Sequence, residues 1–179
     1  MVRKTLLSQR KFETIIHRLA CQLIERHIDF KNTVLIGLQP RGVYLLNRLI
    51  SILKESYKIK NISHGMLDVT FFRDDFRRSE RILSAKSTKM DVIVENKLVV
   101  LIDDVLYTGR SIRAALTAID SFGRPDEIEL LVLIDRRFSR HLPIQPDYLG
   151  TQVDAIQGDR VKVQWDENGI ENIVYLEEK

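Results

Sequence analysis

Two adjacent carboxylates precede a loop rich in hydroxyl groups and glycine in the segment VVLIDDVLYTGRSI, residues 99–112. The acids, Asp103 and Asp104, follow an apolar run that is typical of a buried parallel strand, and open α/β sheets bind ligands where such strands end. Carboxylates accept hydrogen bonds from the hydroxyl groups of a sugar, and they repel phosphate. The acid pair is therefore a candidate site for a sugar diol.

The loop after the acids has the composition of a phosphate cradle. Gly109 allows close approach of the backbone, and the hydroxyl groups of Thr108 and Ser111 can donate hydrogen bonds to phosphate oxygens. Taken singly, an Asp pair is often part of an Asx turn and Ser111 is often a helix N-cap, so neither is specific. The order of acids, hydroxyl and glycine favours a ribose 5-phosphate. Neither a G-x-x-x-x-G-K-[ST] nor a G-x-G-x-x-G motif occurs.

Hydrophobic periodicity places these residues in a succession of strands and helices. It predicts helices at 8–27, 43–53 and 111–122 and strands at 33–38, 66–72, 98–102, 128–134, 161–163 and 173–176. Their alternation predicts an α/β fold with a parallel sheet flanked by helices, in which the last strands form an appendage. The charged segment 73–89 contains few large apolar residues and is too long for an ordinary connection, which favours a functional lid over about 73–92.

Length and composition limit the kinds of protein to consider. The chain has 179 residues, of which 44% are hydrophobic, so we expect a single domain over 1–179. A net charge of +3 suits partners that carry phosphate but is low for a dedicated nucleic-acid binder. The chain has a single cysteine, Cys21, which excludes a disulfide framework. We expect its thiol to pack in the core and the protein to reside in a reducing cytoplasm. We expect neither a signal peptide nor a membrane-spanning segment.

The acid pair and its loop resemble the binding motif for 5-phosphoribosyl-1-pyrophosphate (PRPP) of the type I phosphoribosyltransferases: four apolar residues, two acids, then a Thr-Gly loop. Within that family, DDVLYTGRS, GMLDVTFFRDD and the segment IDRR followed by LPIQPDYLG are similar to uracil phosphoribosyltransferases that also regulate pyrimidine operons. This resemblance covers almost the whole chain. It implies a sheet with a small hood, at about 136–179, and a flexible loop that closes over PRPP.

The resemblance implies a role for each matching residue. Asp103 and Asp104 would hold the ribose hydroxyls, and Mg²⁺ would bind through PRPP and through these two acids. The loop that wraps the 5-phosphate would be Val105, Leu106, Tyr107, Thr108, Gly109, Arg110 and Ser111. Pro40, Arg41 and Gly42 match the pyrophosphate loop, although relatives often have Thr at the position of Pro40. The catalytic set would be Asp103, Asp104, Arg41 and Arg73, with Arg73 at the base of the flexible loop. Arg136 and Val161 match positions that contact uracil.

The same resemblance implies a second class of function, in which the protein loaded with uridine monophosphate (UMP) binds the messenger RNA of a pyrimidine operon. Candidate RNA contacts are Arg18, Arg26, Arg137 and Arg140. Two positions depart from the RNA-binding relatives, Cys21 in place of a common His and Gln145 in place of an Arg. A homodimer or a higher homo-oligomer is expected by analogy. Two alternatives remain open: a transferase for another nucleobase, and an RNA-binding regulator with little enzymatic activity.

Overall fold

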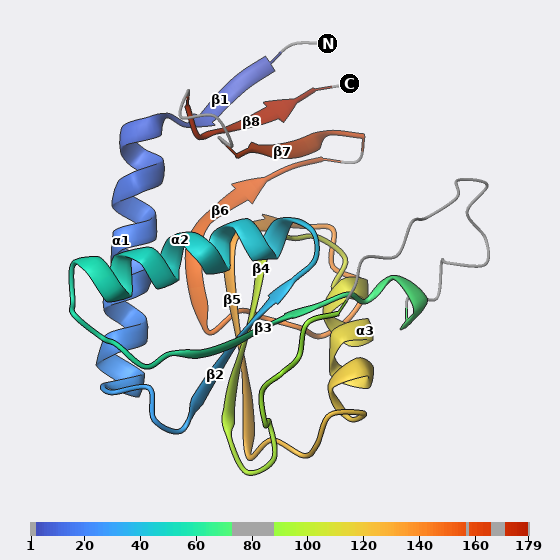
Figure 1. Ribbon diagram of the computed structural model, residues 1–179. Helices are drawn as coiled ribbons and strands as arrows, with labels where there is room; N and C mark the ends of the chain where they lie inside the picture. The colour runs from blue at the N-terminus through green and yellow to red at the C-terminus, as the bar shows by residue number, and fades with distance from the viewer. Residues whose placement is uncertain (1–2, 73–87, 157, 166–170, 179) are drawn as a thin grey trace.

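The computed structural model describes residues 3–72, 88–156, 158–165 and 171–178, and its centre is a parallel sheet of five strands (Figure 1). The strand order is β3-β2-β4-β5-β6, with bounds β3 Ser63–Leu67, β2 Thr33–Leu38, β4 Leu98–Leu106, β5 Glu127–Arg137 and β6 Tyr148–Asp154. All four pairings are parallel. The predicted α/β class is therefore confirmed.

Helices cover both faces of this sheet, which explains why its central strands are apolar throughout. α1, Gln9–His27, and α2, Arg41–Glu55, lie on one face, and α3, Arg110–Ile119, lies on the other (Figure 1). Every residue of β2 is buried, as expected for a strand with a helix layer on each side. α1 presents the side chains of Phe12, Ile16, Leu19 and Leu23 to the core at helical spacing.

A smaller antiparallel sheet stands beyond β6 at the end of the molecule where β4 and β5 finish (Figure 1). Its order is β1-β8-β7, with bounds β1 Arg3–Leu7, β8 Ile173–Glu177 and β7 Arg160–Gln164. Strands from both ends of the described chain thus pair in it. Its apolar side chains, including Val161, Val163 and Val174, join the same core cluster as α1 and α2.

Several predicted boundaries were wrong. The strand expected at 66–72 is β3 at 63–67, followed by a short 3-10 helix, η1, Thr70–Phe72. The strand expected to end at 102 continues to Leu106, because Asp103 and Leu106 still pair with β5. β1 and β6 were not predicted. The predicted lid lies mostly outside the described residues, although Lys89 near its end forms a bridge with Met66. None of the described helices is long and apolar enough to cross a membrane.

Candidate active site

Two loops meet at the centre of the sheet, where the strand order reverses. β2 and β4 are neighbours there, and the chain leaves them toward α2 and α3, on opposite faces. Such a switch point is where open α/β sheets place their ligands. A cavity of about 450 Å³ opens at this point. It is lined by Leu38, Gln39, Pro40, Arg41, Asp68, Val69, Thr70, Asp103, Asp104, Val105, Tyr107, Ser111, Arg136 and Val161.

The first loop brings the start of α2 against the end of β4. A Cβ atom on Gly42 would lie 2.2 Å from the carbonyl oxygen of Ile102, so only glycine allows this approach. α2 begins at Arg41, and its N-cap residue, Pro40, makes no side-chain cap hydrogen bond. The Gln39–Pro40 peptide bond is cis, and the N–H of Gln39 donates to the carbonyl of Leu67 at 2.9 Å. The first turn of α2 therefore offers backbone amides that suit an anion.

The acid pair lies in the last part of β4. Asp103 Oδ1 accepts a hydrogen bond from the backbone N–H of Asp104 at 2.9 Å. The Asp104 side chain is buried, and its Oδ2 atom has no hydrogen-bond partner among the described residues. Burial raises the pKa of Asp104, whereas the Arg41 guanidinium, a backbone N–H and the indole of Trp165 lower it. A buried carboxylate oxygen without a donor is prepared to accept one from a ligand hydroxyl.

Trp165 faces the same carboxylate from the side of the small antiparallel sheet. Its indole N–H acts on the pKa of Asp104, although neither Nε1 nor Asp104 Oδ2 has a partner at hydrogen-bond geometry in the described chain. The indole ring is held by an edge contact with Phe12, at 5.2 Å between centroids, and by stacking on Tyr44 at 5.9 Å. Sequence reasoning missed this residue. The signal that could have identified it is an aromatic side chain directly after the strand at 160–164.

The second loop forms a smaller cavity of about 130 Å³ beside the first. It is lined by Asp103, Val105, Leu106, Tyr107, Thr108, Gly109, Arg110, Ser111 and Ile112. Gly109 is the N-cap of α3 and has φ of 89°, a left-handed conformation that favours glycine. Gly109 has no side chain that could cap α3, although the N–H of Arg110 lies 3.4 Å from Thr108 Oγ1, and a helix N-terminus is a favourable place for a bound anion.

Arg136 and Val161 line the cavity on the side of the small antiparallel sheet. Both side chains are buried, and the Arg136 guanidinium carbon lies 4.1 Å from the centroid of the Tyr107 ring. Arg136 Nε has no hydrogen-bond partner in the described part of the chain. The predicted uracil contacts therefore border the same space as the acid pair.

Most of the predicted site residues come together around these two cavities. Gly42 packs behind them against β4, and Arg73 lies outside the described residues. The residues Asp68, Val69 and Thr70 also line the larger cavity but were not predicted. Asp68 Oδ1 accepts from the backbone N–H of Thr70 at 2.8 Å, an Asx turn directly after β3. The polar segment at the end of that strand was the available signal.

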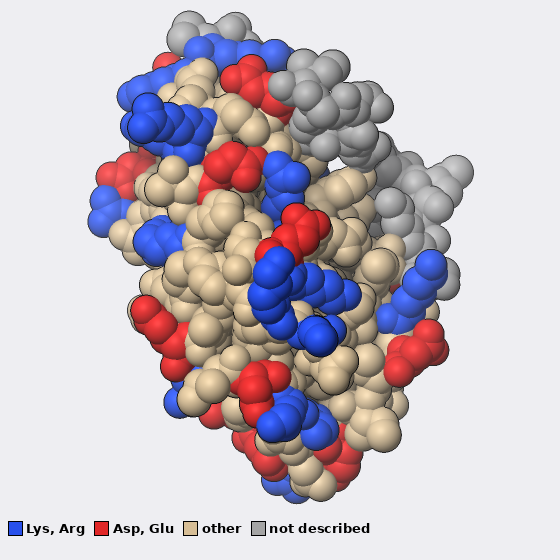
Figure 2. Space-filling model, turned by 60° about the vertical axis from the view of Figure 1, so that its left-hand side comes forward, with Lys and Arg blue, Asp and Glu red and all other residues tan. Residues whose placement is uncertain are grey.

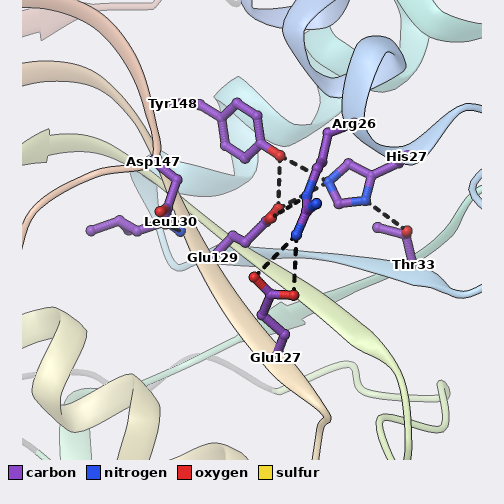
Figure 3. Close-up of polar contacts among 8 residues, drawn as sticks. All are labelled: Arg26, His27, Thr33, Glu127, Glu129, Leu130, Asp147 and Tyr148. Carbon is purple, nitrogen blue, oxygen red and sulfur yellow. Dashed lines mark hydrogen bonds and ion pairs between the residues drawn. The ribbon is translucent and has the colours of Figure 1, made fainter.

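The four arginines expected to contact RNA all have acceptors within the chain. Arg18 donates to the carbonyls of Leu149 and Gly150, and Arg137 forms an ion pair with Asp154. Arg26 forms ion pairs with Glu127 and Glu129 (Figure 3). Arg140 bonds to Asp135 and to the carbonyl of Tyr107. RNA binding by these residues stays a prediction.

The acid pair lies between two loops at the switch point of a parallel sheet, which is the fold of the type I phosphoribosyltransferases. The chain belongs to this class, since the family described as "Phosphoribosyl transferase domain" matches residues 2–168. The hypoxanthine phosphoribosyl transferase of Trypanosoma cruzi has the same fold, with a TM-score of 0.71 at 17% identity over 97% of this chain and 91% of that one. A hypoxanthine phosphoribosyltransferase of Staphylococcus aureus gives 0.64 at 21% identity over 84% and 78%.

Closer relatives place the chain more narrowly. The bifunctional protein PyrR of Desulfosudis oleivorans is 39% identical over 174 residues, which cover 97% of this chain and 96% of the relative. The bifunctional protein PyrR of Microcystis aeruginosa is 44% identical over 158 residues, 88% of each chain. Within the phosphoribosyltransferases, the chain is thus of the PyrR type.

Proposed function

We propose that this protein transfers the 5-phosphoribosyl group of PRPP to uracil and produces UMP and pyrophosphate. The observation that carries the proposal is the convergence of two amide-bearing loops and a buried acid pair on one cavity, with Arg136 and Val161 at its far side. One loop lies on each side of the acid pair. PRPP carries a phosphate at one end of its ribose and a pyrophosphate at the other, so it would need an anion site on each side of the ribose hydroxyls. The resemblance to uracil phosphoribosyltransferases suggests the acceptor.

In this reaction the bond between the anomeric carbon and a pyrophosphate oxygen breaks, and a bond from that carbon to the N1 atom of uracil forms as the N1 proton passes to water or to the departing pyrophosphate. Asp103 and Asp104 would accept hydrogen bonds from the ribose hydroxyls and stabilise the positive charge that develops on the ribose. Arg41 and the first turn of α2 would stabilise the departing pyrophosphate. The protein would thus act by orienting the reactants and by electrostatics, with no side chain as nucleophile.

Mg²⁺ fits the residues present. Carboxylate oxygens are the hard ligands that Mg²⁺ prefers, and it is usually held by one or two carboxylates together with phosphates of the substrate. Asp103 and Asp104 provide this donor set, and Asp104 Oδ2 lacks a partner among the described residues. When bound, the ion would neutralise negative charge on the pyrophosphate.

The test is uracil-dependent release of pyrophosphate from PRPP in the presence of Mg²⁺. We expect Asp104→Asn to lower kcat/KM by about 100-fold or more, because the amide loses the charge that stabilises the ribose in the transition state. Asp120→Asn, at the exposed end of α3, is the matched control and should retain activity. Full activity of the Asp104 variant would argue against the proposed ribose site.

The acceptor is tested separately with a panel of nucleobases. We expect turnover with uracil and little with hypoxanthine or guanine. A protein that uses hypoxanthine but not uracil would retain the ribose site and would overturn the proposed acceptor.

A second role as a regulator that binds pyrimidine operon RNA is favoured by the word "bifunctional" in the names of the relatives. On the face drawn in Figure 2, Lys and Arg form several groups interspersed with Asp and Glu. We propose that RNA binding depends on UMP and that Arg18, Arg26 and Arg137 contribute through their exposed edges. Filter binding to a pyrimidine leader RNA at several salt concentrations tests this role, and an affinity independent of salt would argue against it.

A homodimer or higher homo-oligomer in the cytoplasm would complete this assignment. We propose both by analogy to the relatives. Sedimentation equilibrium of the purified protein would give its assembly, and a mass of one chain at micromolar concentration would contradict the oligomer.

A further inference from the structure

The phosphate loop is supported from behind by a segment that has no assigned part in the reaction. This supporting segment, residues 138–146, lies between β5 and β6. Leu142 and Ile144 lie within 3.5 Å of the position that a Cβ atom on Gly109 would occupy, so the segment packs directly on the loop. The smaller cavity is lined by loop residues and by none from 138–146, which places it on the other side of the loop.

Two carbonyl groups of the loop are bound by this supporting segment. The carbonyl of Tyr107 accepts from Arg140 Nη1 at 2.5 Å, and the carbonyl of Thr108 accepts from the backbone N–H of His141 at 3.1 Å. Arg140 is anchored in turn, because its Nη2 donates to Asp135 at the end of β5. The Arg140 side chain is 22% exposed and that of Asp135 9%, so their ion pair is partly shielded from water, whereas the bond to the Tyr107 carbonyl lies at the exposed surface.

The planarity of the peptide bond determines the direction in which the N–H groups of this loop point. In a planar trans peptide, the C=O of one residue and the N–H of the next point in opposite directions. Holding the Tyr107 carbonyl toward Arg140 therefore directs the N–H of Thr108 away from the supporting segment. Holding the Thr108 carbonyl toward His141 does the same for the N–H of Gly109. Both amides then face the side on which the smaller cavity lies.

We propose that Arg140 is a positioning residue, which orients the amide of Thr108 toward the 5-phosphate of the substrate by bonding the Tyr107 carbonyl to Asp135, while the backbone N–H of His141 orients the amide of Gly109. The proposal rests on the ribose 5-phosphate site described above and is independent of the acceptor base. It gives Arg140 a role in the transferase reaction beside its predicted contact with RNA. The ring of Tyr107, which lies over Arg136, would be fixed at the same time.

The experiment compares two inhibitors that occupy different halves of the site. Ribose 5-phosphate depends on the loop that Arg140 supports, whereas inorganic pyrophosphate binds at the start of α2. For Arg140→Gln we expect the inhibition constant of ribose 5-phosphate to rise about tenfold or more, the scale of one charge-assisted hydrogen bond. The inhibition constant of pyrophosphate should change less than about twofold.

Two further variants make the result specific. Arg140→Lys keeps the charge but has one ammonium group for two acceptors, so ribose 5-phosphate binding should be restored in part. Arg48→Gln removes an arginine of α2 that pairs with Glu13, and it should leave both inhibition constants unchanged. Binding can be measured by calorimetry at a temperature where each variant is folded, as judged by circular dichroism. If Arg140→Gln does not fold, Arg140→Lys alone tests the proposal. Its inhibition constant for ribose 5-phosphate should then rise more than its inhibition constant for pyrophosphate.

The possible outcomes separate this inference from the proposed function. Equal losses for both inhibitors, or no loss for either, would overturn the positioning role. Absence of ribose 5-phosphate binding in the unsubstituted protein would overturn it together with the ribose site. Selective loss in a protein that does not use uracil would support the positioning role and reject only the proposed acceptor.

Discussion

Two glycines serve the site in different physical ways. Gly109 supplies a backbone conformation, with φ of 89°, that lets the phosphate loop turn into α3. Gly42 instead supplies the absence of a side chain, since a Cβ atom there would lie 2.2 Å from Ile102 O and 3.1 Å from Asp103 Cα. This residue of the proposed pyrophosphate loop thus sets how closely α2 approaches the acid pair.

Gly42→Ala should therefore destabilise the protein and damage the site together. The clash is with backbone atoms, which cannot rotate away, so we expect a loss of about 2–3 kcal/mol in the free energy of unfolding. Urea denaturation measures it, and Ser51→Ala, at an exposed position of the same helix, is the control. Unchanged stability of the Gly42→Ala variant would contradict the close packing of α2 on β4.

At the scale of elements, one aromatic cluster joins the small antiparallel sheet to α1 and α2, the two helices on one face of the central sheet. Trp165, directly after β7, packs on Phe12 of α1 and Tyr44 of α2. Its indole N–H also lowers the pKa of Asp104, against the larger effect of burial. The position of β7 relative to α1 and α2 is therefore linked to the pKa of Asp104.

Trp165→Phe keeps an aromatic ring in this cluster and removes the N–H. Because the indole lowers the pKa of Asp104, its loss should raise that pKa. If the carboxylate form is needed for catalysis, the acid limb of the kcat/KM profile should move to higher pH, with the neutral-pH plateau less affected. An acid limb at the same pH in both proteins would show that the indole has no such effect.

Sequence reasoning found the elements whose signal is local and missed those defined by distant partners. The apolar run before Asp103 and the Thr-Gly loop identified the strand and the family. β1 is only five residues long and pairs with β8 at the other end of the described chain, so no local pattern indicates it. The continuation of β4 to Leu106 likewise depends on its pairing with β5.

Across the whole molecule, a buried polar cluster lies where β2, β5 and β6 begin, at the opposite end of the sheet from the cavity, and Figure 3 draws its contacts. His27 Nε2 lies 3.0 Å from Glu129 Oε2 and 3.1 Å from the Tyr148 hydroxyl, and Thr33 Oγ1 lies 3.0 Å from His27 Nδ1. These contacts suit a neutral ring that donates from Nε2 and accepts at Nδ1. Burial lowers the pKa of His27, and burial with the Glu129 hydrogen bond raises that of Tyr148.

This cluster predicts how stability depends on pH. The pKa of His27 is lower in the folded than in the unfolded protein, so the unfolded chain binds more protons in the interval between them. Stability should be complete above the ordinary histidine value of about 6.5 and should fall as the pH decreases below it, by at most about 1.4 kcal/mol per unit. His27→Gln should reduce that slope in urea unfolding measured at several pH values. An identical slope in both proteins would contradict a buried neutral His27.

The pairing of β1 with β8 also has a consequence for the order in which the working enzyme appears during synthesis. The acid pair, both loops and the supporting segment all precede residue 147 in the chain, whereas the small sheet needs residues 173–177. β1 is made before β8 and remains without this strand partner until residues 173–177 have been synthesised. The proposed sugar-phosphate site thus precedes the small sheet in the order of synthesis, and transfer is expected only after residues 173–177 have been made.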